Sequence, residues 1–263
     1  MSRLATVAGR PRHLAGWRPD RPDHRDLALP APKTAIPDRA RLETMPPVLD
    51  QGSIGSCTAN MGCTMLAFLE RKGPESLLFS RLFLYARTRQ LEGTPLTEDS
   101  GAEIRDVLKA LARFGVCYEV TWPYTKPEVR FVVEPSDVAI KEAAEHKALF
   151  YYRCPDLFTI KASIAQGFPV GFGFSVPENM MSDDCARTGL VYYPGSRERF
   201  NGGHATTIMA FDDAFKVGND VGAVECQNSW GPEWGLQGRF WLPYRFFNEK
   251  LADDCWTLRR AEV

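Results

Sequence analysis

Residues 50–60 read Asp50-Gln-Gly-Ser-Ile-Gly-Ser-Cys57-Thr-Ala-Asn60, a polar, glycine-rich turn that leads into one cysteine. Apolar side chains follow at a spacing that predicts a buried helix: Met61, Met65, Phe68 and Leu69. Ser56 would cap this helix, which places Cys57 in its first turn, where backbone N–H groups and the helix dipole favour a thiolate. A nucleophilic cysteine is one interpretation, and a small buried cysteine beside a turn is the other. The second is commoner for a lone cysteine, so the choice depends on residues elsewhere in the chain.

The composition is that of a globular protein with one large domain or two packed halves. The 263 residues are 44% hydrophobic and 25% charged, with a net charge of −1. This balance gives no reason to expect nucleic acid or a membrane as a partner, and no apolar run approaches about 18 residues. The seven cysteines include no CxxC pair that would indicate a zinc ribbon. We expect a monomer in a reduced, cytoplasmic setting because no signal-peptide core is seen, with export by a non-classical route left open.

Predicted helices come first in the chain and predicted strands second. The helices are expected at 79–90, 104–115, 138–149 and 157–166, the second opened by a capping box at Ser100-Gly-Ala-Glu103. The strands are expected at 169–176, 189–193, 205–211, 223–227 and 238–242. This order predicts an α+β protein, with a mainly helical half at 36–150 and a mainly β half at 151–263 after a leader at 1–35. A cleft between two such halves is a natural place for an active site.

His204 is the histidine best placed to be half buried and reactive, because two glycines precede it and an apolar strand follows. The other histidines lie in the leader or, for His146, on a predicted solvated helix face. Further along, Asn228 in the run Gln-Asn-Ser-Trp-Gly could accept the N–H of a histidine ring and fix its orientation. Taken singly, a structural histidine and a Gly/Pro turn are the simpler interpretations.

Three motifs taken in order resemble the papain family of cysteine peptidases: Gln-Gly-x-x-Gly-Ser-Cys, then Gly-His-Ala, then Asn-Ser-Trp-Gly-x-x-Trp-Gly. His204 lies 147 positions after Cys57, and Asn228 lies 24 positions after His204. The first spacing falls within the roughly 130–150 residues typical of the family. Fainter similarity runs from about Ile36 to the C-terminus. The resemblance implies the papain-like fold, a helical half and an antiparallel, β-barrel-like half with the active-site cleft between them.

The same resemblance implies a cysteine endopeptidase that hydrolyses peptide bonds in proteins or peptides through a thioester acyl-enzyme. Cys57 would be the nucleophile, His204 the proton carrier and Asn228 the residue that orients His204. The Gln51 side chain and the Cys57 backbone N–H would form the oxyanion hole. The residues expected to contact substrate or to cover the His–Asn pair are Ser100, Gly101, Gly203 and Trp230. No metal or organic cofactor is needed for this chemistry.

Two other functions remain open on the sequence. One is another cysteine acyl-transfer enzyme, such as an amidase or a transglutaminase-like enzyme, although those usually orient the histidine with a carboxylate. The other is an inactive binding relative, although all four catalytic positions carry the expected residue types.

The sequence departs from the family's pattern around the nucleophile. Ile54 stands where the family has a cysteine, and Thr58 stands where it has an aromatic residue. The family's Cys-Asn-Gly-Gly loop, which pairs with substrate backbone, is replaced by Glu98-Asp-Ser-Gly101. The disulfide that joins these two loops in the family therefore cannot form, in keeping with a reduced compartment.

Residues 1–35 are expected to be a short autoinhibitory leader anchored by Trp17, as the pro-segments of the family imply. Up to Arg41 the chain has nine Lys or Arg and four Asp, a net charge of +5, which leaves −6 for the rest. Opposite charges would favour docking, and extended proline-rich backbone would enter a cleft at little entropic cost. A loose arm that serves export or partner binding is the competing interpretation.

Overall fold

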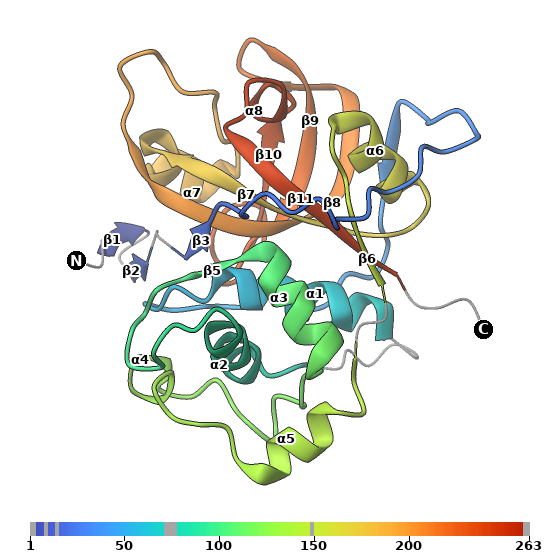
Figure 1. Ribbon diagram of the computed structural model, residues 1–263. Helices are drawn as coiled ribbons and strands as arrows, with labels where there is room; N and C mark the ends of the chain where they lie inside the picture. The colour runs from blue at the N-terminus through green and yellow to red at the C-terminus, as the bar shows by residue number, and fades with distance from the viewer. Residues whose placement is uncertain (1–3, 8–9, 14–15, 71–77, 148–149, 260–263) are drawn as a thin grey trace.

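The computed structural model describes residues 4–7, 10–13, 16–70, 78–147 and 150–259. Figure 1 shows two halves, with helices α1 to α5 in the lower one and a sheet with α6 to α8 in the upper one. Each half has a hydrophobic core of its own. This arrangement confirms the predicted α+β class.

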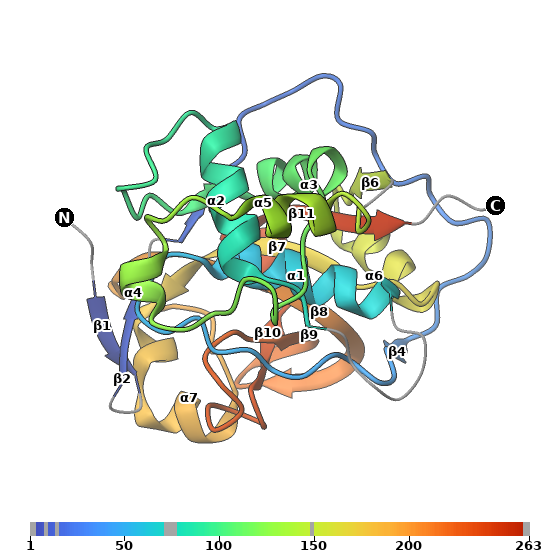
Figure 2. The same ribbon diagram turned by 90° about the horizontal axis from the view of Figure 1, so that it is seen from below.

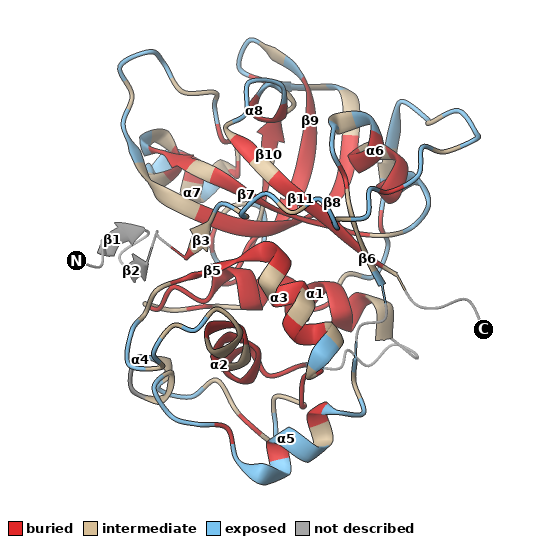
Figure 3. Ribbon diagram, in the orientation of Figure 1, coloured by how far each residue is buried: buried red, intermediate tan, exposed pale blue. Residues whose placement is uncertain are grey.

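The helical half is built around α1 (Cys57–Glu70), which is buried along nearly its whole length (Figure 3). A helix with apolar side chains on all sides must pack against other elements on all sides. α2 (Arg81–Leu91) and α3 (Ile104–Arg113) cover one side of α1, and the sheet covers the other (Figure 2). Two shorter helices, α4 (Pro127–Arg130) and α5 (Asp137–Ala143), complete this half. Among the described residues, none of the helices combines the length and apolar character that crossing a membrane requires.

The β half is a seven-stranded antiparallel sheet with the strand order β10-β9-β8-β7-β11-β6, and β4 pairs with β8 outside this path. The strands are β4 (Arg39–Arg41), β6 (Phe150–Arg153), β7 (Val170–Pro177), β8 (Phe200–Val217), β9 (Asp220–Gln227), β10 (Arg239–Pro243) and β11 (Ala252–Arg259). The helices of this half are α6 (Leu157–Ala165), η1 (Glu178–Met181), α7 (Asp183–Thr188) and α8 (Arg245–Asn248).

The described N-terminal residues form short strands, and from residue 16 onward they lie on the body of the protein. β1 (Leu4–Val7) pairs with β2 (Arg10–His13), and β3 (Trp17–Arg18) runs parallel to β5 (Ala102–Glu103) of the helical half. Further on, Ala28 forms a bridge with Arg153 at the end of β6. From residue 16 onward, the predicted leader is therefore in contact with both halves.

Some local predictions were wrong. α3 begins at Ile104, and the Ser100 hydroxyl donates to the Gly101 carbonyl at 2.9 Å, so the predicted capping box is not formed. Residues 189–193 contribute only an isolated bridge between Leu190 and Trp241. Strands β6 and β11 were not predicted, because β6 has only four residues and β11 begins with the polar pair Asp253-Asp254, and such runs become strands only when a partner strand lies beside them.

The prediction of a solvated helix face at His146 was also wrong. α5 ends at Ala143, before this residue. The His146 ring packs against Phe79 and Tyr118, with ring centroids 5.5 and 4.5 Å away. The aromatic partners come from other parts of the chain, which the local pattern of charges could not show.

Residues near both ends of the chain contribute to the two hydrophobic cores. Leu29 of the predicted leader and Leu42, which follows β4, belong to the core of the β half. Trp256 and Leu258 of β11 belong to the core of the helical half. Side chains from near both ends of the chain thus pack in the two cores, which holds the halves together.

Gly62 faces α2 and α3 from within α1, and an added methyl group would lie 2.7 Å from Val107 Cγ1 and 3.1 Å from Leu84 Cδ2. We expect Gly62→Ala to lower the free energy of unfolding by about 1–3 kcal/mol, because overpacking outweighs the better helix propensity of alanine. Urea denaturation followed by circular dichroism measures the change. At Gly195 nothing lies within 4 Å of an added Cβ, so Gly195→Ala is the control. Equal stability of Gly62→Ala and the wild type would contradict the prediction.

Candidate active site

Cys57 is the first residue of α1 and is fully buried. Its thiol accepts the backbone N–H of Ala205 in β8, so the sulfur lies against the residue that follows His204. Ser56 stands at the predicted N-cap position, and its carbonyl accepts the Asn60 N–H at 3.0 Å, but its hydroxyl bonds to the Tyr124 hydroxyl and the Asn60 side chain and not to a backbone N–H of the helix. The start of the helix is therefore held by a tertiary contact.

His204 and Asn228 are brought together by the pairing of β8 with β9. His204 lies in β8, and Asn228 directly follows β9. His204 Nε2 lies 2.8 Å from Asn228 Oδ1, and both residues are buried. Because an amide oxygen can only accept, Nε2 carries the proton in this bond.

Trp230 lies over the His204 ring, with the ring centroids 4.9 Å apart and the planes inclined by 36°. Trp234 packs its edge against Trp230 at a centroid distance of 5.0 Å. Both tryptophans are buried. They keep water away from the His204–Asn228 bond, and a hydrogen bond is stronger in such a low-dielectric setting.

Gln51 is held by the loop that follows β9. Its backbone N–H donates to the Ser229 carbonyl at 2.8 Å, and its Oε1 accepts the Ser229 hydroxyl at 2.7 Å. Its Nε2 donates to the Ile54 carbonyl at 3.1 Å, in the turn before Cys57. Ser229 was not predicted as a site residue. Its position between Asn228 and Trp230 is the one feature of the sequence that could have identified it.

Asp99 ties the turn before Cys57 to the loop at 98–101, where the sequence lacks the two cysteines of the family. Both carboxylate oxygens accept the Gly55 N–H at 3.0 Å, and Oδ1 also accepts the Tyr85 hydroxyl at 2.6 Å. All seven cysteines are described, and all are free and buried. Hydrogen bonds to one carboxylate thus join the two loops.

The residues expected to contact substrate lie on both sides of the nucleophile. Gly203 and Trp230 lie beside His204, whereas Ser100 and Gly101 lie in the opposing loop. The Gly101 N–H already donates to the Tyr85 hydroxyl at 3.0 Å. The next residue, Ala102, contacts the N-terminal segment instead: its backbone N–H donates to the Gly16 carbonyl at 2.9 Å.

The N-terminal segment passes over the candidate nucleophile. A side chain on Gly16 would place its Cβ 2.6 Å from Cys57 Sγ and 2.8 Å from the Gly55 carbonyl oxygen, so this position requires glycine. The Trp17 indole packs on Gly173 and Gly203, where an added Cβ would lie 2.1 and 2.7 Å from the ring. The residue predicted as the anchor of the leader therefore lies in the cleft, one position from the residue on the sulfur.

The N-terminal segment contributes acids as well as bases to its contacts with the body. Asp26 pairs with Arg105 and Arg153 at 3.2 and 3.5 Å. In another ion pair the segment contributes the base, since Arg18 pairs with Glu92 of the body. Ion pairs of both polarities thus hold the segment on the body.

Asp20 is a further acid of the segment in this interface. Its oxygens accept the Arg105 backbone N–H at 3.0 Å and the Trp256 indole N–H at 2.7 Å. Burial, followed by the negative charge of Asp254, raises the pKa of Asp20 to about 7, although these two donors lower it in part. Docking of the segment is thereby linked to pH.

Burial raises the pKa of the Cys57 thiol to about 12, although the N–H groups of Ala205 and Thr58 lower it in part. The sequence predicted a thiolate at the start of the helix. With Gly16 over the sulfur, burial raises the pKa of the thiol by more than the neighbouring N–H groups lower it.

One group of acids among the described residues has the spacing of a cation site, namely Glu92, Glu103 and Asp106, with oxygens within 4.8 Å of one another. Glu92 is bonded to Arg18 and to the Glu103 backbone N–H. Glu103 pairs with Arg21 at 3.3 Å. These contacts place the group in the interface with the N-terminal segment.

No family model matches this chain. It is 36% identical to an uncharacterized peptidase C1-like protein of Acanthamoeba polyphaga mimivirus, over 94% of this chain and 86% of that protein. Xylellain, a cysteine protease of Xylella fastidiosa, matches with a TM-score of 0.85 at 32% identity, over 100% of this chain and 99% of that one. ProCathepsin B of Trypanosoma congolense matches with a TM-score of 0.72 at 14% identity, over 94% of this chain and 87% of that one.

These similarities confirm the fold and the family that the three motifs predicted. The helical half and the antiparallel sheet are arranged as in xylellain and proCathepsin B. The chain therefore belongs to the papain-like, or C1, family of cysteine peptidases, and it is a hydrolase.

Proposed function

We propose that this peptidase cleaves peptide bonds through a thioester acyl-enzyme, with Cys57 as nucleophile and His204 as proton carrier. The Cys57 thiol gives its proton to His204, its sulfur attacks the substrate carbonyl carbon, and the departing amine takes that proton from His204. Water then gives a proton to His204 and attacks the thioester, and His204 passes this proton to the departing sulfur, which releases the acid and restores the thiol. The observation that carries the proposal is the 2.8 Å bond from His204 Nε2 to Asn228 Oδ1. It orients the ring and assigns proton exchange to Nδ1.

The negative oxygen of the tetrahedral intermediate takes two donors, the Gln51 side-chain N–H and the Cys57 backbone N–H. The Gln51 amide nitrogen has a second hydrogen besides the one donated to Ile54. Ser229 acts as a positioning residue, because its bond to Oε1 decides which end of the amide carries the donors.

The identity of the orienting residue favours a peptidase over the other cysteine acyl-transfer enzymes. Those enzymes usually orient the histidine with a carboxylate, whereas His204 is bonded here to the amide of Asn228. An inactive binding relative would have no use for Gln51 held beside the nucleophile turn by two side-chain contacts. Peptides and proteins are therefore the proposed substrates.

The N-terminal segment acts in this proposal as an autoinhibitor. Gly16 occupies the space over the Cys57 sulfur, and its carbonyl takes the Ala102 N–H that a substrate backbone would use. The segment also removes water from the thiol, which raises its pKa and lowers the fraction of reactive thiolate. Inhibition thus has a steric and an electrostatic part.

We expect Cys57→Ala to abolish hydrolysis of a peptide library, because the thioester cannot form without the sulfur. Mass spectrometry of the digested library measures the loss, and iodoacetamide should no longer label residue 57. Cys185→Ala, at a buried thiol on α7, is the matched control and should keep wild-type turnover. Hydrolysis by folded Cys57→Ala protein would end the proposal.

Gln51→Ala should lower kcat on the order of 10²–10³-fold with little change in KM, because the oxyanion donor acts in the transition state. Gln51→Glu, which keeps the length but loses the N–H donors, should lose as much. Steady-state kinetics on a peptide amide measures both variants. Gln90→Ala, on the outer side of α2, is the control. A wild-type kcat in Gln51→Ala would rule out the oxyanion role.

Docking of the N-terminal segment should weaken with rising pH, because docking raises the pKa of Asp20 from 3.8 to about 7. The docked Asp20 carboxyl favours its protonated form. Docking is therefore strongest below pH 3.8, and this contribution to docking is lost above about pH 7. A peptide of residues 10–25 should bind a Cys57→Ala chain lacking residues 1–25 at least about 10-fold more weakly at pH 7.5 than at pH 5. Isothermal titration calorimetry measures the affinities.

Two controls accompany this measurement. The peptide with Asp20→Asn should bind with little pH dependence, because asparagine does not titrate. With Cys57 intact, the shortened chain should hydrolyse small peptides faster than the full-length chain. Equal kcat/KM values would show that the segment does not inhibit, and tighter binding at pH 7.5 would contradict the role of Asp20.

A further inference from the structure

The hydroxyl of Tyr124 contacts both ends of the turn that carries the two proposed oxyanion donors. Its Oη donates to the Gln51 carbonyl at 2.8 Å and lies 2.5 Å from the Ser56 hydroxyl. Gln51 carries one of the donors in its side chain. Ser56 directly precedes Cys57, whose backbone N–H is the other donor. One hydroxyl thus joins the residue that bears the first donor to the residue next to the second.

The direction of each hydrogen bond follows from the number of protons. A carbonyl oxygen can only accept, so the single proton of the Tyr124 hydroxyl is used on Gln51. The Ser56 hydroxyl therefore donates to Tyr124, and its own oxygen accepts the Asn60 side-chain N–H at 3.1 Å. Burial raises the pKa of Tyr124, so its hydroxyl keeps its proton. A continuous chain of hydrogen bonds thus ends at the Gln51 carbonyl, and each bond in such a chain strengthens the next.

Asn60 also fixes the direction of the Cys57 N–H. The Ser56 carbonyl accepts the Asn60 backbone N–H at 3.0 Å and the Asn60 side-chain N–H at 2.9 Å. In a planar trans peptide, the carbonyl of one residue and the N–H of the next point in opposite directions. The two bonds from Asn60 to the Ser56 carbonyl therefore set the direction in which Cys57 presents its N–H.

Tyr124 is itself held by an ion pair. The Arg81 guanidinium stacks on the Tyr124 ring, 3.9 Å from the ring centroid, and donates to the Asp50 carbonyl at 3.0 Å. Glu119 pairs with Arg81 at 3.0 Å and accepts the Tyr124 backbone N–H at 2.7 Å. Both the ring and the backbone of Tyr124 are therefore fixed, which also fixes its hydroxyl relative to the turn.

We propose that Tyr124 is a positioning residue for the reaction, because its hydroxyl keeps the Gln51 side chain and the Cys57 N–H at the separation that one negative oxygen requires. The inference rests on the proposed function, in which these two groups stabilise the tetrahedral intermediate. In this role Tyr124 acts through Gln51 and Ser56. Loss of the hydroxyl should therefore affect the transition state, in which the negative oxygen forms, more than the binding of substrate.

Tyr124→Phe removes the hydroxyl and keeps the ring on which Arg81 stacks. We expect kcat on a peptide amide to fall by about 10- to 100-fold with little change in KM, because small displacements of catalytic groups have effects of this size. Tyr244→Phe is the matched control, since it removes a hydroxyl that donates to Asp213 at 2.7 Å in the β half, and it should keep wild-type kcat. A wild-type kcat in Tyr124→Phe, or a rise in KM alone, would overturn the proposal.

Ser56→Ala interrupts the same chain of hydrogen bonds without changing Tyr124, so it serves as the test if Tyr124→Phe does not fold. Thermal unfolding followed by circular dichroism identifies the variants that fold. We expect Ser56→Ala to lower kcat with little change in KM, for the same reason. Folded Ser56→Ala protein with wild-type kcat would count against the proposal in the same way.

A double-mutant cycle shows whether Tyr124 acts through Gln51. Without the Gln51 side chain no separation between two donors is left to maintain, so Tyr124→Phe should lower kcat much less in the Gln51→Ala background than in the wild type. Equal factors in both backgrounds would overturn the proposal. A wild-type kcat in Gln51→Ala would overturn the oxyanion role and this inference together. A loss in Gln51→Ala without a loss in Tyr124→Phe would overturn this inference alone.

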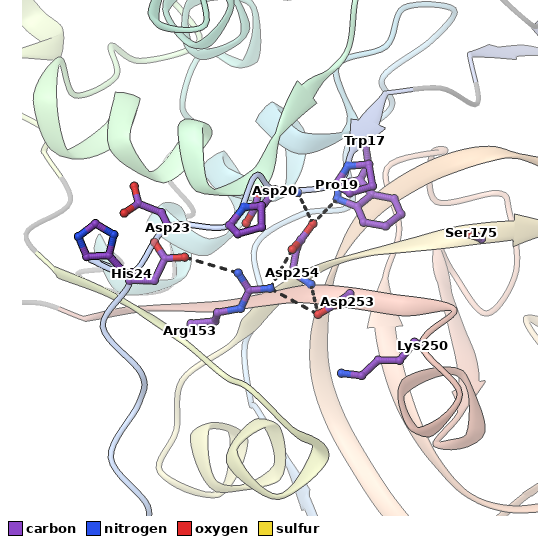
Figure 4. Close-up of a pocket in the computed structure, with 12 residues that line it drawn as sticks. Trp17, Pro19, Asp20, Asp23, His24, Arg153, Ser175, Lys250, Asp253 and Asp254 are labelled. Carbon is purple, nitrogen blue, oxygen red and sulfur yellow. Dashed lines mark hydrogen bonds and ion pairs between the residues drawn. The ribbon is translucent and has the colours of Figure 1, made fainter.

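Two reactions of Cys57 test the inference without hydrolysis of a peptide. A peptide aldehyde takes the Cys57 sulfur on its carbonyl carbon and the thiol proton on its oxygen, which then lies in the oxyanion hole. Iodoacetamide forms a carbon–sulfur bond and releases iodide and the thiol proton, so it places no oxygen there. Docking of the N-terminal segment rests on other contacts, including those of Trp17 and Asp20 with Asp254 (Figure 4). The variant should therefore leave access to the sulfur unchanged.

In the full-length protein, Tyr124→Phe should raise the Kd of the aldehyde about 10-fold and leave the rate of alkylation at Cys57 unchanged. Isothermal titration calorimetry measures the Kd, and mass spectrometry measures the alkylation. An unchanged Kd, or an equal loss in both reactions, would overturn the role of Tyr124. A raised Kd with unchanged alkylation, in a protein that hydrolyses no peptide, would refute the proposed function and support the role of Tyr124.

Discussion

The contact between the start of α1 and the strand β8 is the constraint on which the active site depends. Cys57 begins the helix, and its sulfur accepts the N–H of Ala205, next to His204. The helix is covered by α2 and α3 on one side and by the sheet on the other, so it cannot slide without opening a core. Because β8 pairs with β9, Asn228 directly after β9 is fixed in turn beside His204.

Three consecutive residues after β9 each hold a different part of the site. Asn228 orients the His204 ring, Ser229 orients the Gln51 amide, and Trp230 covers the ring from the side. The backbone of the same loop bonds to residues 49–51 on both sides of the Asp50–Trp230 bridge. A short run of sequence thus links the histidine to the turn that precedes the nucleophile.

In the proposed autoinhibition, the N-terminal segment acts on the thiol chemically as well as sterically. Gly16 excludes water from Cys57, and desolvation then outweighs the N–H groups that would stabilise a thiolate. The segment is held by ion pairs of both polarities and by the buried acids Asp20 and Asp254.

The sequence by itself determined the family, because the order and spacing of three motifs are properties of the chain that need no coordinates. It also singled out Cys57, His204, Asn228 and Gln51, whose residue types suit the chemistry. It could not show that Asp99 replaces a disulfide or that Asp254 receives Trp17, because each looks like an ordinary polar loop residue until folding brings a distant partner. Strands β6 and β11, and the burial that raises the pKa of the Cys57 thiol, were likewise decided only in three dimensions, since pairing and desolvation depend on segments far apart in the chain.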